Sequence, residues 1–378
     1  MTVALLGSIP WPFVVASLTS MVLTLTLVAT LRWHGRLSLD GCAGVQKSHR
    51  HAVPRVGGIA VVAAALAVYV ADGSPGKSLL GQILIAGAPA FAAGLTEDLT
   101  KRVSAHARLL ASMSCAVLAF SISGYSITRL DVPGIDWLLG FPLLSVAFTA
   151  FAVAGVINAV NIIDGMNGLA CITALVIFST FALLGSALGD PVLVKTCWIL
   201  GGATFGFVLF NWPLGKIFLG DGGAYFLGFG IAWLAVLVPA RHPEVSAWAS
   251  LLICGFPILE VLFSMQRRWR CKRPIDAPDN LHLHSLIKRR LVRWLLPNSS
   301  QLVRNSVTGA FMGCSGLLPA CVALHWPNDT LILMGSFALC ALLYATVYAR
   351  LTQFHWRFLS SHAKVLAKSW LLGEGKVL

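Results

Sequence analysis

Four carboxylates occupy positions where an acidic side chain is costly unless it binds something. Glu97, Asp98, Asp164 and Asp221 each stand at one end of an apolar segment, and they belong to three separate loops. Magnesium prefers oxygen ligands and takes one or two carboxylates together with phosphate oxygens and water. Any one of these acids also fits the role of a helix cap. Together they predict a site for a divalent cation and a phosphate compound.

The surroundings of Asp164 and Asp221 support this interpretation. The loop of Asp164 holds no Lys or Arg and is rich in amides, which are costly at that depth unless they bind a polar ligand; the amides are Asn158, Asn161 and Asn167. Asp221 has glycine on both sides, and glycine lets a backbone approach a ligand closely. Phe218, three residues earlier, either stacks on a base or is seated in lipid.

Cationic and imidazole side chains add the groups that an anionic ligand requires. A glycine pair at 57–58 follows a basic segment, and this order suits a diphosphate; the segment contains Lys47, His49 and Arg55. Farther along, His282 and His284 are separated by one residue. No third ligand at a zinc-site spacing accompanies them, so a pair that faces phosphate is the favoured interpretation.

Two further acidic positions have open interpretations. Glu97 and Asp98 are adjacent, so their repulsion is relieved either by a cation or by the neighbouring Lys101, Arg102 and Arg108 in an interfacial salt-bridge cluster. Glu260 is the one acid well inside an apolar segment, where it either pairs with an arginine of the next loop or takes part in chemistry. The six acids of the opposite face receive no function; they are Asp72, Asp131, Asp136, Asp190, Glu244 and Asp329.

The elements that position these residues follow from composition. The 378 residues are 57% hydrophobic and 11% charged, against about 25% charged in a soluble domain, which excludes an ordinary soluble enzyme. The predicted fold is an all-α polytopic membrane protein with eleven spans. The spans are 9–31, 56–71, 79–96, 108–124, 142–160, 168–188, 193–211, 222–240, 247–265, 306–326 and 330–349.

Basic residues predict the orientation of the spans. Of 28 Lys and Arg, 24 lie in one alternate set of loops, and such residues concentrate on the cytoplasmic side. The N terminus is therefore expected outside, and the C terminus and all four acids on the cytoplasmic side. The dispersal of these cations over many loops argues against nucleic acid as a partner. The uncharged stretch before Arg32 lacks the basic start of a signal peptide and is expected to remain as the first span.

The domain organisation expected is one membrane domain, 1–349, with catalytic loops at 32–55, 97–108, 161–167, 212–221 and 266–304, followed by a basic amphipathic tail, 350–378. Segments of 266–304 and of the tail combine basic and apolar residues at helical spacing, which favours anchoring on an anionic membrane surface. The nine cysteines form no Cys-x-x-Cys pair and are interpreted as apolar filling.

In this order the motifs resemble those of the polyprenyl-phosphate N-acetylhexosamine-1-phosphate transferase family, also called glycosyltransferase family 4. The five motifs are residues 54–58, Glu97-Asp98, 158–168, 218–223 and His282-Leu-His284. The resemblance implies transfer of sugar 1-phosphate from a UDP-N-acetylhexosamine to undecaprenyl phosphate in the bacterial inner membrane, with release of UMP. It implies Mg²⁺, with Mn²⁺ as a substitute, and a first step in O-antigen, lipopolysaccharide or other cell-envelope glycan synthesis. A homodimer is compatible with it.

The resemblance also assigns roles to residues. Asp98, Glu97 and Asp164 are expected to be catalytic, with Asp98 deprotonating or orienting the lipid phosphate, and Asp221 with Asp98 is expected to bind the metal. The expected substrate-binding residues are Lys47, His49, Arg55, Asn158, Asn161, Asn167, Phe218, His282 and His284. Attack by the lipid phosphate is expected to be direct, and a two-step route through a covalent carboxylate intermediate remains open.

The chain departs from the family pattern at four places, and other functions stay open. Glu97 replaces an aspartate, Asn167 an acid, Ala224 a serine, and Ser285 stands within a reduced histidine cluster. Many spans with embedded acids also suit an ion-coupled secondary transporter of a polar or anionic solute, although transporter sites lie near the bilayer midplane. A scaffold without activity is a third alternative. Neither the sugar nor the oligomeric state can be predicted.

Overall fold

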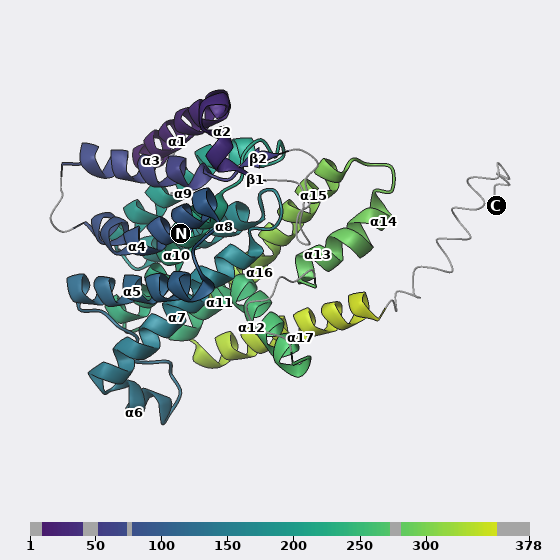
Figure 1. Ribbon diagram of the computed structural model, residues 1–378. Coiled ribbons are helices and arrows are strands. Elements are labelled where there is room, and N and C mark those ends of the chain that lie inside the picture. Colours follow the sequence, from purple (N-terminus) through teal and green to yellow (C-terminus); the bar gives the residue numbers. More distant parts are fainter. Residues whose placement is uncertain (1–9, 41–51, 74–77, 273–280, 354–378) are drawn as a thin grey trace.

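The computed structural model describes residues 10–40, 52–73, 78–272 and 281–353, and this part of the chain is almost entirely helical (Figure 1). Its first half contains α1 (Trp11–Ala29), α2 (Leu31–Ser38), β1 (Leu39–Asp40), β2 (Val53–Pro54), α3 (Gly57–Ala71), α4 (Leu79–Thr100), α5 (Ala105–Ser123), α6 (Ile135–Leu139), α7 (Pro142–Ile163) and α8 (Leu169–Ala187). Its second half contains α9 (Pro191–Asn211), α10 (Gly220–Arg241), α11 (Ala247–Ile253), α12 (Gly255–Arg270), α13 (Leu283–Ile287), a π-helical turn (Lys288–Val292), α14 (Arg293–Leu295), α15 (Gln301–Gly313), a 3₁₀ turn (Cys314–Gly316), α16 (Leu317–His325) and α17 (Thr330–Thr352).

Several of these helices begin at a residue that caps them. Ser78, Ser104 and Ser300 each accept a hydrogen bond from an amide in the first turn of the helix that follows, at 3.0, 3.2 and 3.2 Å. Asp190 and Asp329 do the same for α9 and α17, each at 3.0 Å. These caps satisfy amides that no helix can pair internally, so the apolar runs start at defined residues. Two of the acids that received no function therefore have a structural one.

Each predicted span coincides with a helix or a bent pair of helices, but not every one of these meets the length expected of a membrane crossing. Within the described ranges, nine helices are long and apolar enough to cross a membrane, and α11 with α12 adds a tenth if the bent pair is one span. The remaining predicted span coincides with α3, which has 15 residues and is shorter than the usual crossing. The membrane class is confirmed, whereas the count of eleven and the orientation stay predictions.

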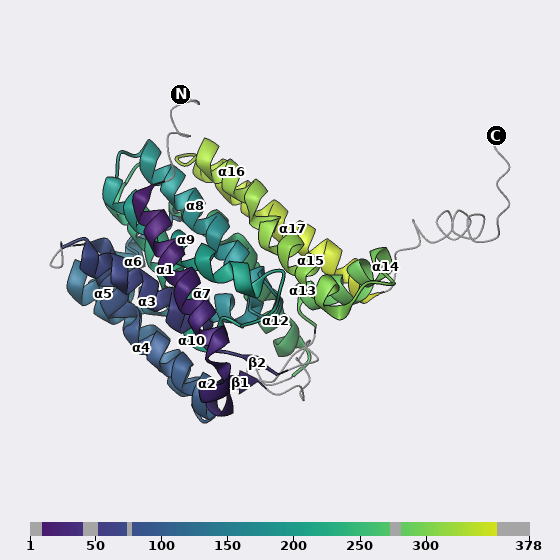
Figure 2. The same ribbon diagram turned by 90° about the horizontal axis from the view of Figure 1, so that it is seen from above.

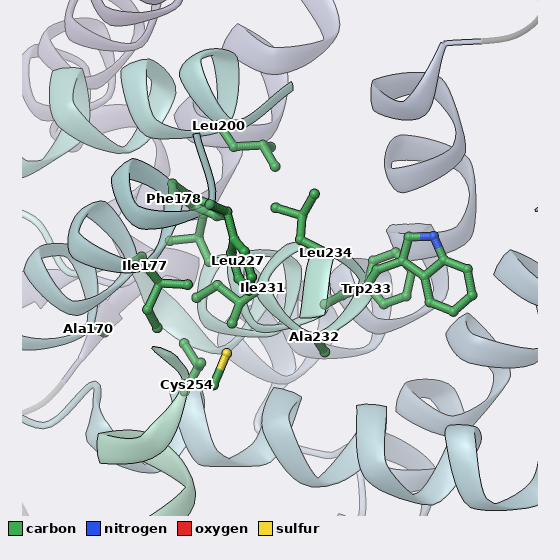
Figure 3. Packing of buried hydrophobic residues seen from close by; sticks show 14 of the residues in the cluster. Ala170, Ile177, Phe178, Leu200, Leu227, Ile231, Ala232, Trp233, Leu234 and Cys254 are labelled. Carbon is green, nitrogen blue, oxygen red and sulfur yellow. The ribbon is translucent and has the colours of Figure 1, made fainter. Parts of the chain in front are cut away.

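The core is built around α10. This helix packs against α3, α4, α7 and α11, and 18 of its 22 residues are buried. Its Ile231 and Leu234 lie with Phe178 of α8 and Leu200 of α9 in the apolar centre shown in Figure 3. In Figure 2, α15, α16 and α17 lie together on the opposite flank of the bundle from α3, α4 and α5. Residues 222–240 are apolar on every side of the helix, and a helix of this kind is expected to be buried inside the protein. The position of α10 agrees with this expectation.

Glycine allows α3 and α4 to approach the first turn of α10 at backbone distance. A Cβ placed on Gly58 would lie 2.4 Å from the Cα of Gly223, and one on Gly94 would lie 2.6 Å from the carbonyl carbon of Asp221. No side chain fits at either contact. The backbones of three motif segments therefore meet at one point, where the chemistry-bearing side chains begin.

Candidate active site

Asp221 is the centre of a cluster of charged and amide side chains at the N terminus of α10. Its Oδ1 accepts hydrogen bonds from Nη2 of Arg55 at 2.8 Å and from Nδ2 of Asn161 at 3.0 Å. Its Oδ2 accepts one from Nη1 of Arg108 at 2.8 Å. Charge-assisted bonds of this kind are roughly twice as strong as neutral ones. One carboxylate thus joins the segment between β2 and α3, and the helices α5 and α7, to α10.

Asp98 lies directly behind Asp221 and binds its backbone. The Asp98 carboxylate accepts hydrogen bonds from the amides of Asp221 and Gly222, each at 3.0 Å, and Nε of Arg55 lies 3.5 Å away. The amides at a helix N terminus favour an anion, and here that anion belongs to the protein. Gly220 makes the arrangement fit, because it has φ +77° and a Cβ there would lie 2.6 Å from Oδ2 of Asp98.

Arg55 is positioned by backbone pairing on both sides of it. β1 and β2 form a short antiparallel ladder, and the Arg55 amide donates to the Ser38 carbonyl at 2.9 Å. The amides of Gly57 and Gly58 donate to the carbonyls of residues 218 and 219 at 3.0 and 2.8 Å. The sequence suggested that this glycine pair serves an anionic ligand; instead it ties the 54–58 segment to the 218–223 segment. Anion binding in this region falls to the Arg55 side chain.

The two loops that follow α7 and α9 are joined by Asn211. Its Oδ1 accepts a hydrogen bond from the Gly168 amide at 2.6 Å, and its Nδ2 donates to the Ile217 carbonyl at 2.9 Å. The loop that holds Asp164 is therefore tied to the loop that leads to Asp221. Asn158 donates to the Ala154 carbonyl within α7 at 2.8 Å, and its side chain lines the same cavity as Asp164.

The two histidines and Glu260 form a second, buried cluster. The rings of His282 and His284 stack with centroids 5.4 Å apart and planes at 4°. Glu260 accepts a hydrogen bond from the Leu283 amide at 3.0 Å, and its Oε1 lies 3.1 Å from Nδ1 of His282. Among the residues that the structure describes, Glu260 thus contacts the two histidines and this amide, and pairing with an arginine of the next loop is not seen there.

A cavity of about 1600 Å³ connects the two clusters. Its polar end is lined by Arg55, Arg108, Asn158, Asn161, Asp164, Asp221, His282 and His284. From there it continues between α5, α7, α10 and α12 along apolar side chains that include Leu109, Met113, Phe148, Val156, Ile258 and Val261. Such a cavity combines a small number of convergent polar groups with a long apolar wall.

Three predicted site residues lie elsewhere. Oε2 of Glu97 accepts the Val103 amide at 2.8 Å, in the loop between α4 and α5. Asn167 is 2% exposed, with its side chain bonded to Asn305 and Ser306 of α15. Phe218 takes part in the backbone pairing with Pro54. None of the three lines the cavity among the residues that the structure describes. Lys47 and His49 lie outside the described residues.

Several residues that sequence reasoning did not assign to the site are part of it. Arg108 was considered only as a neighbour of Glu97 and Asp98, yet it binds Asp221. Tyr225, one helical turn after Asp221, lines the cavity and is 1% exposed. Its i, i+4 spacing from Asp221 was a usable signal, because such residues share a helix face.

Lys288 is a further missed residue. It was expected on an amphipathic surface helix, but it lines the cavity, and its Nζ donates to Oδ1 of Asn305 at 3.1 Å. Burial, with Arg304 and Arg289 nearby, lowers the pKa of Lys288 to about 8. Leu286 and Ile287, also expected on the membrane surface, are 1% and 4% exposed and are buried within the protein. The segment around Lys288 is thus part of the site wall rather than a membrane anchor alone.

Asp221 is the acid that best fits a divalent cation. No group of three His, Cys, Asp or Glu that would enclose a metal occurs in the described ranges. Mg²⁺ needs only one or two carboxylates when substrate phosphates supply the other oxygens. Both oxygens of Asp221 are held by side chains that can turn toward a phosphate, whereas those of Asp98 are held by backbone amides. The donor set therefore suits a cation that arrives with a phosphate substrate.

Comparison with known proteins shows what the central part of this chain is similar to. The model of glycosyl transferase family 4 matches residues 80–239, the part that contains α4 to α10. A probable undecaprenyl-phosphate N-acetylglucosaminyl 1-phosphate transferase of Bacillus subtilis is 28% identical over 242 residues, or 63% of this chain and 66% of that protein. The undecaprenyl-phosphate alpha-N-acetylglucosaminyl 1-phosphate transferase of Yersinia pestis is 26% identical over 65% of this chain and 68% of its own length.

A second group of relatives acts on a different sugar compound. The phospho-N-acetylmuramoyl-pentapeptide-transferase of Geobacillus kaustophilus is 30% identical over 206 residues, or 50% of this chain and 63% of that protein. The chain thus spans about two thirds of the length of the relatives it matches. The region that the family model matches includes Asp98, Asp164 and Asp221. Over its central region the chain is therefore similar to members of glycosyl transferase family 4, and its described helices are those of a membrane-embedded protein.

Proposed function

We propose that this protein transfers a sugar 1-phosphate of the N-acetylhexosamine type from a UDP-sugar to undecaprenyl phosphate and releases UMP. The observation that carries the proposal is a cavity of about 1600 Å³ with charged side chains around Asp221 and a mainly apolar remaining wall. An acceptor with a phosphate head and a hydrocarbon chain matches both parts. Similarity to undecaprenyl-phosphate N-acetylglucosaminyl 1-phosphate transferases supports the same acceptor.

In the proposed reaction an oxygen of the lipid phosphate attacks the sugar-bearing phosphorus of the donor. A phosphorus–oxygen bond forms to the lipid, the bond to the bridging oxygen breaks, and UMP leaves with that oxygen. Such transfers depend mainly on positioning and electrostatic stabilisation. Arg55 and Arg108 would neutralise phosphate oxygens, since each already binds a carboxylate at 2.8 Å. Asn161 and Asp164 would contact the nucleotide part of the donor.

Mg²⁺, held by Asp221, would supply charge neutralisation of the donor diphosphate. In this scheme Asp98 acts on its protein neighbours, which is neither of the two roles toward the lipid phosphate that the sequence predicted. Both of its oxygens accept backbone amides and its side chain is 1% exposed, so it orients Asp221 and Arg55 rather than removing a proton. Direct attack requires no covalent intermediate with either carboxylate.

The basic loops support a location of the charged end on the cytoplasmic side of the bacterial inner membrane, where a UDP-sugar is available. The product, a lipid-linked sugar diphosphate, is the kind of compound on which a surface glycan such as an O-antigen is built. We place the protein at the first step of such a synthesis. The transferred sugar is left open between N-acetylglucosamine and 6-deoxy-N-acetylhexosamines.

One experiment tests this function. Membranes containing the full chain are incubated with a panel of labelled UDP-sugars, Mg²⁺ and undecaprenyl phosphate, and the lipid extract and UMP are measured. We expect a lipid-linked sugar diphosphate and equimolar UMP with at least one donor. Membranes with Asp221→Ala and reactions without undecaprenyl phosphate are the controls. Absence of product with every donor, from a folded protein, contradicts the proposal and favours the transporter or scaffold alternative.

A further inference from the structure

Glu260 is a buried carboxylate to which the proposed reaction gives no role. It lies on α12, is fully buried, and faces the two histidines where α13 begins. A carboxylate buried in a membrane protein is costly unless it is paired, and it marks a functional position more often than a structural one. Its partners are therefore informative about what it does.

The contacts of Glu260 fix which nitrogen of His282 carries a proton. An ionised carboxylate accepts hydrogen bonds only, so Nδ1 of His282, 3.1 Å from Oε1, is the donor. Ser264 Oγ lies 3.1 Å from the same Nδ1. With Nδ1 committed to the carboxylate, a proton on Nε2 lets the ring donate toward a phosphate oxygen. A carboxylate behind an imidazole orients histidines in the same way in metal sites and catalytic triads.

His284 stands in a similar relation to the other oxygen of Glu260. Its Nδ1 lies 3.9 Å from Oε2, and neither atom has a hydrogen-bond partner within the described part of the chain. The two rings are nearly parallel, so a small closure of this gap would place both Nδ1 atoms on one carboxylate. An unpaired buried donor and acceptor that face each other favour that closure.

The opposite side of the His284 ring faces the proposed substrate. A Cβ placed on Gly165 would lie 3.1 Å from Nε2 of His284, so this nitrogen points at the loop immediately after Asp164. Both histidines line the cavity that Asp164 and Asp221 also line. Each ring therefore stands between a buried carboxylate and the space that the donor diphosphate would occupy.

We propose that Glu260 is a positioning residue of this transferase, which holds His282 and His284 by their Nδ1 atoms so that Nε2 of each ring faces the donor diphosphate. The inference rests on the proposed function. Glu260 touches no substrate in this arrangement, and all of its effect passes through the two rings. Removal of the carboxylate would let the imidazoles change tautomer and turn, and phosphate contacts would weaken.

The test compares Glu260→Gln in two backgrounds. In the otherwise unchanged full chain, loss of an orienting carboxylate behind a histidine lowers kcat/KM by about 10–100-fold. In a chain that also carries His282→Asn and His284→Asn, the same substitution is expected to change kcat/KM by less than about 2-fold, because its target is gone. Glu260→Asp, which keeps the charge, is expected to recover part of the loss.

A matched control separates this role from general stability. Asp190 is also a buried carboxylate next to a histidine, 3.1 Å from Nε2 of His242, and it bonds Arg241 at 3.0 Å. It lies at the other end of α10, whose 22 residues span about 33 Å. We expect Asp190→Asn to lower the thermal midpoint in detergent while kcat/KM per folded protein stays within about 2-fold of the unchanged chain.

A second readout does not depend on turnover. Affinity for UDP-N-acetylglucosamine, measured by calorimetry on the solubilised full chain, is expected to fall about 10-fold with Glu260→Gln and to be insensitive to it in the double-asparagine background. Unchanged kcat/KM and affinity in Glu260→Gln, or an equal loss in both backgrounds, overturns the inference. Absence of product from the unchanged chain contradicts the proposed function instead, and the affinities then decide the role of Glu260.

Discussion

The carboxylate of Asp98 accepts hydrogen bonds from the amides of Asp221 and Gly222, each at 3.0 Å, so one acid of the site holds the backbone that carries the other. The two residues are 123 positions apart in the chain. Their relationship makes Asp98 a support of the site, and several expectations depend on it.

Asp98→Asn should remove this support. An amide side chain has one acceptor oxygen instead of two and no charge, so one amide of α10 loses its partner and Asp221 shifts. A displacement on the order of 1 Å at a reacting group costs about 100-fold in rate. We expect UMP release to fall by about that factor in the assay with undecaprenyl phosphate, with the thermal midpoint lowered modestly. Near-normal turnover of this variant would show that Asp98 is dispensable.

Asp221→Asn should abolish the response to Mg²⁺. Chelation with EDTA is expected to stop product formation by the unchanged chain, and added Mg²⁺ is expected to restore it. The asparagine variant lacks the anionic ligand, so its turnover should be lower by about 100-fold or more and insensitive to added Mg²⁺. Asp72→Asn, which changes an acid paired with Lys195, is the control and should titrate like the unchanged chain. A normal Mg²⁺ titration of Asp221→Asn would assign the metal to another residue.

Arg108→Lys should lower kcat/KM by about 10-fold despite the retained charge. Nη1 of Arg108 binds Oδ2 of Asp221 at 2.8 Å, and a lysine cannot reproduce the planar fork that serves a carboxylate and a phosphate together. Arg102→Lys is the matched control, because Arg102 is exposed in the preceding loop. Equal activity of the two variants would remove Arg108 from the site.

Lys288 should cause kcat/KM to decrease at mildly alkaline pH. Burial, with Arg304 and Arg289 nearby, lowers its pKa from 10.5 to about 8, so its positive charge at the cavity wall is lost as pH rises through about 8. kcat/KM for the anionic donor should decline over that range, and Lys288→Gln should lack the decline. The unfolded chain binds more protons between these two pKa values, so this group makes the fold more stable as pH rises there. A falling thermal midpoint over the same range would point to another cause.

Gly58→Ala should destabilise the fold. Its Cβ would lie 2.4 Å from the Cα of Gly223, and overpacking of this kind costs about 1–3 kcal/mol. Gly155→Ala is the control, since no atom lies within 4 Å of the added Cβ. Thermal midpoints of the two variants in detergent should differ by several degrees. Equal midpoints would mean that α3 and α10 can separate without cost.

The sequence predicted most of the helices and most of the residues that meet at Asp221, with Arg108 the exception, because both depend largely on local pattern. Scarcity of acids in an apolar chain is visible in composition, and the motif segments led to Asp221 and to Arg55 and Asn161, which both donate to it. Lys288 was missed because its role depends on the packing of α13 against α15 and α17, which no periodicity encodes. The number of spans also depends on tertiary structure. α3 has only 15 residues, and α11 and α12 form one span only if a pair bent by 79° is counted as one.

Residues 97 and 98 illustrate the limit within the site itself. Adjacent acids in a sequence cannot share one helix face, and the structure sends Asp98 toward α10 and Glu97 toward the Val103 amide. The pattern alone gives no sign of which residue turns inward. Asn167 shows the same limit, since its contacts with α15 involve residues about 140 positions later in the chain.

Asn211 has a consequence for how this chain could change its donor. The side-chain amide of Asn211 accepts a hydrogen bond from the Gly168 amide and donates one to the Ile217 carbonyl. The loop after α7 and the loop after α9 are therefore held together as one rigid unit. A different sugar or nucleotide cannot be accommodated by sliding one loop past the other without breaking both bonds. Altered donor preference would therefore arise by replacing side chains of these two loops. Mutant libraries that aim to change the donor should leave Asn211 unchanged.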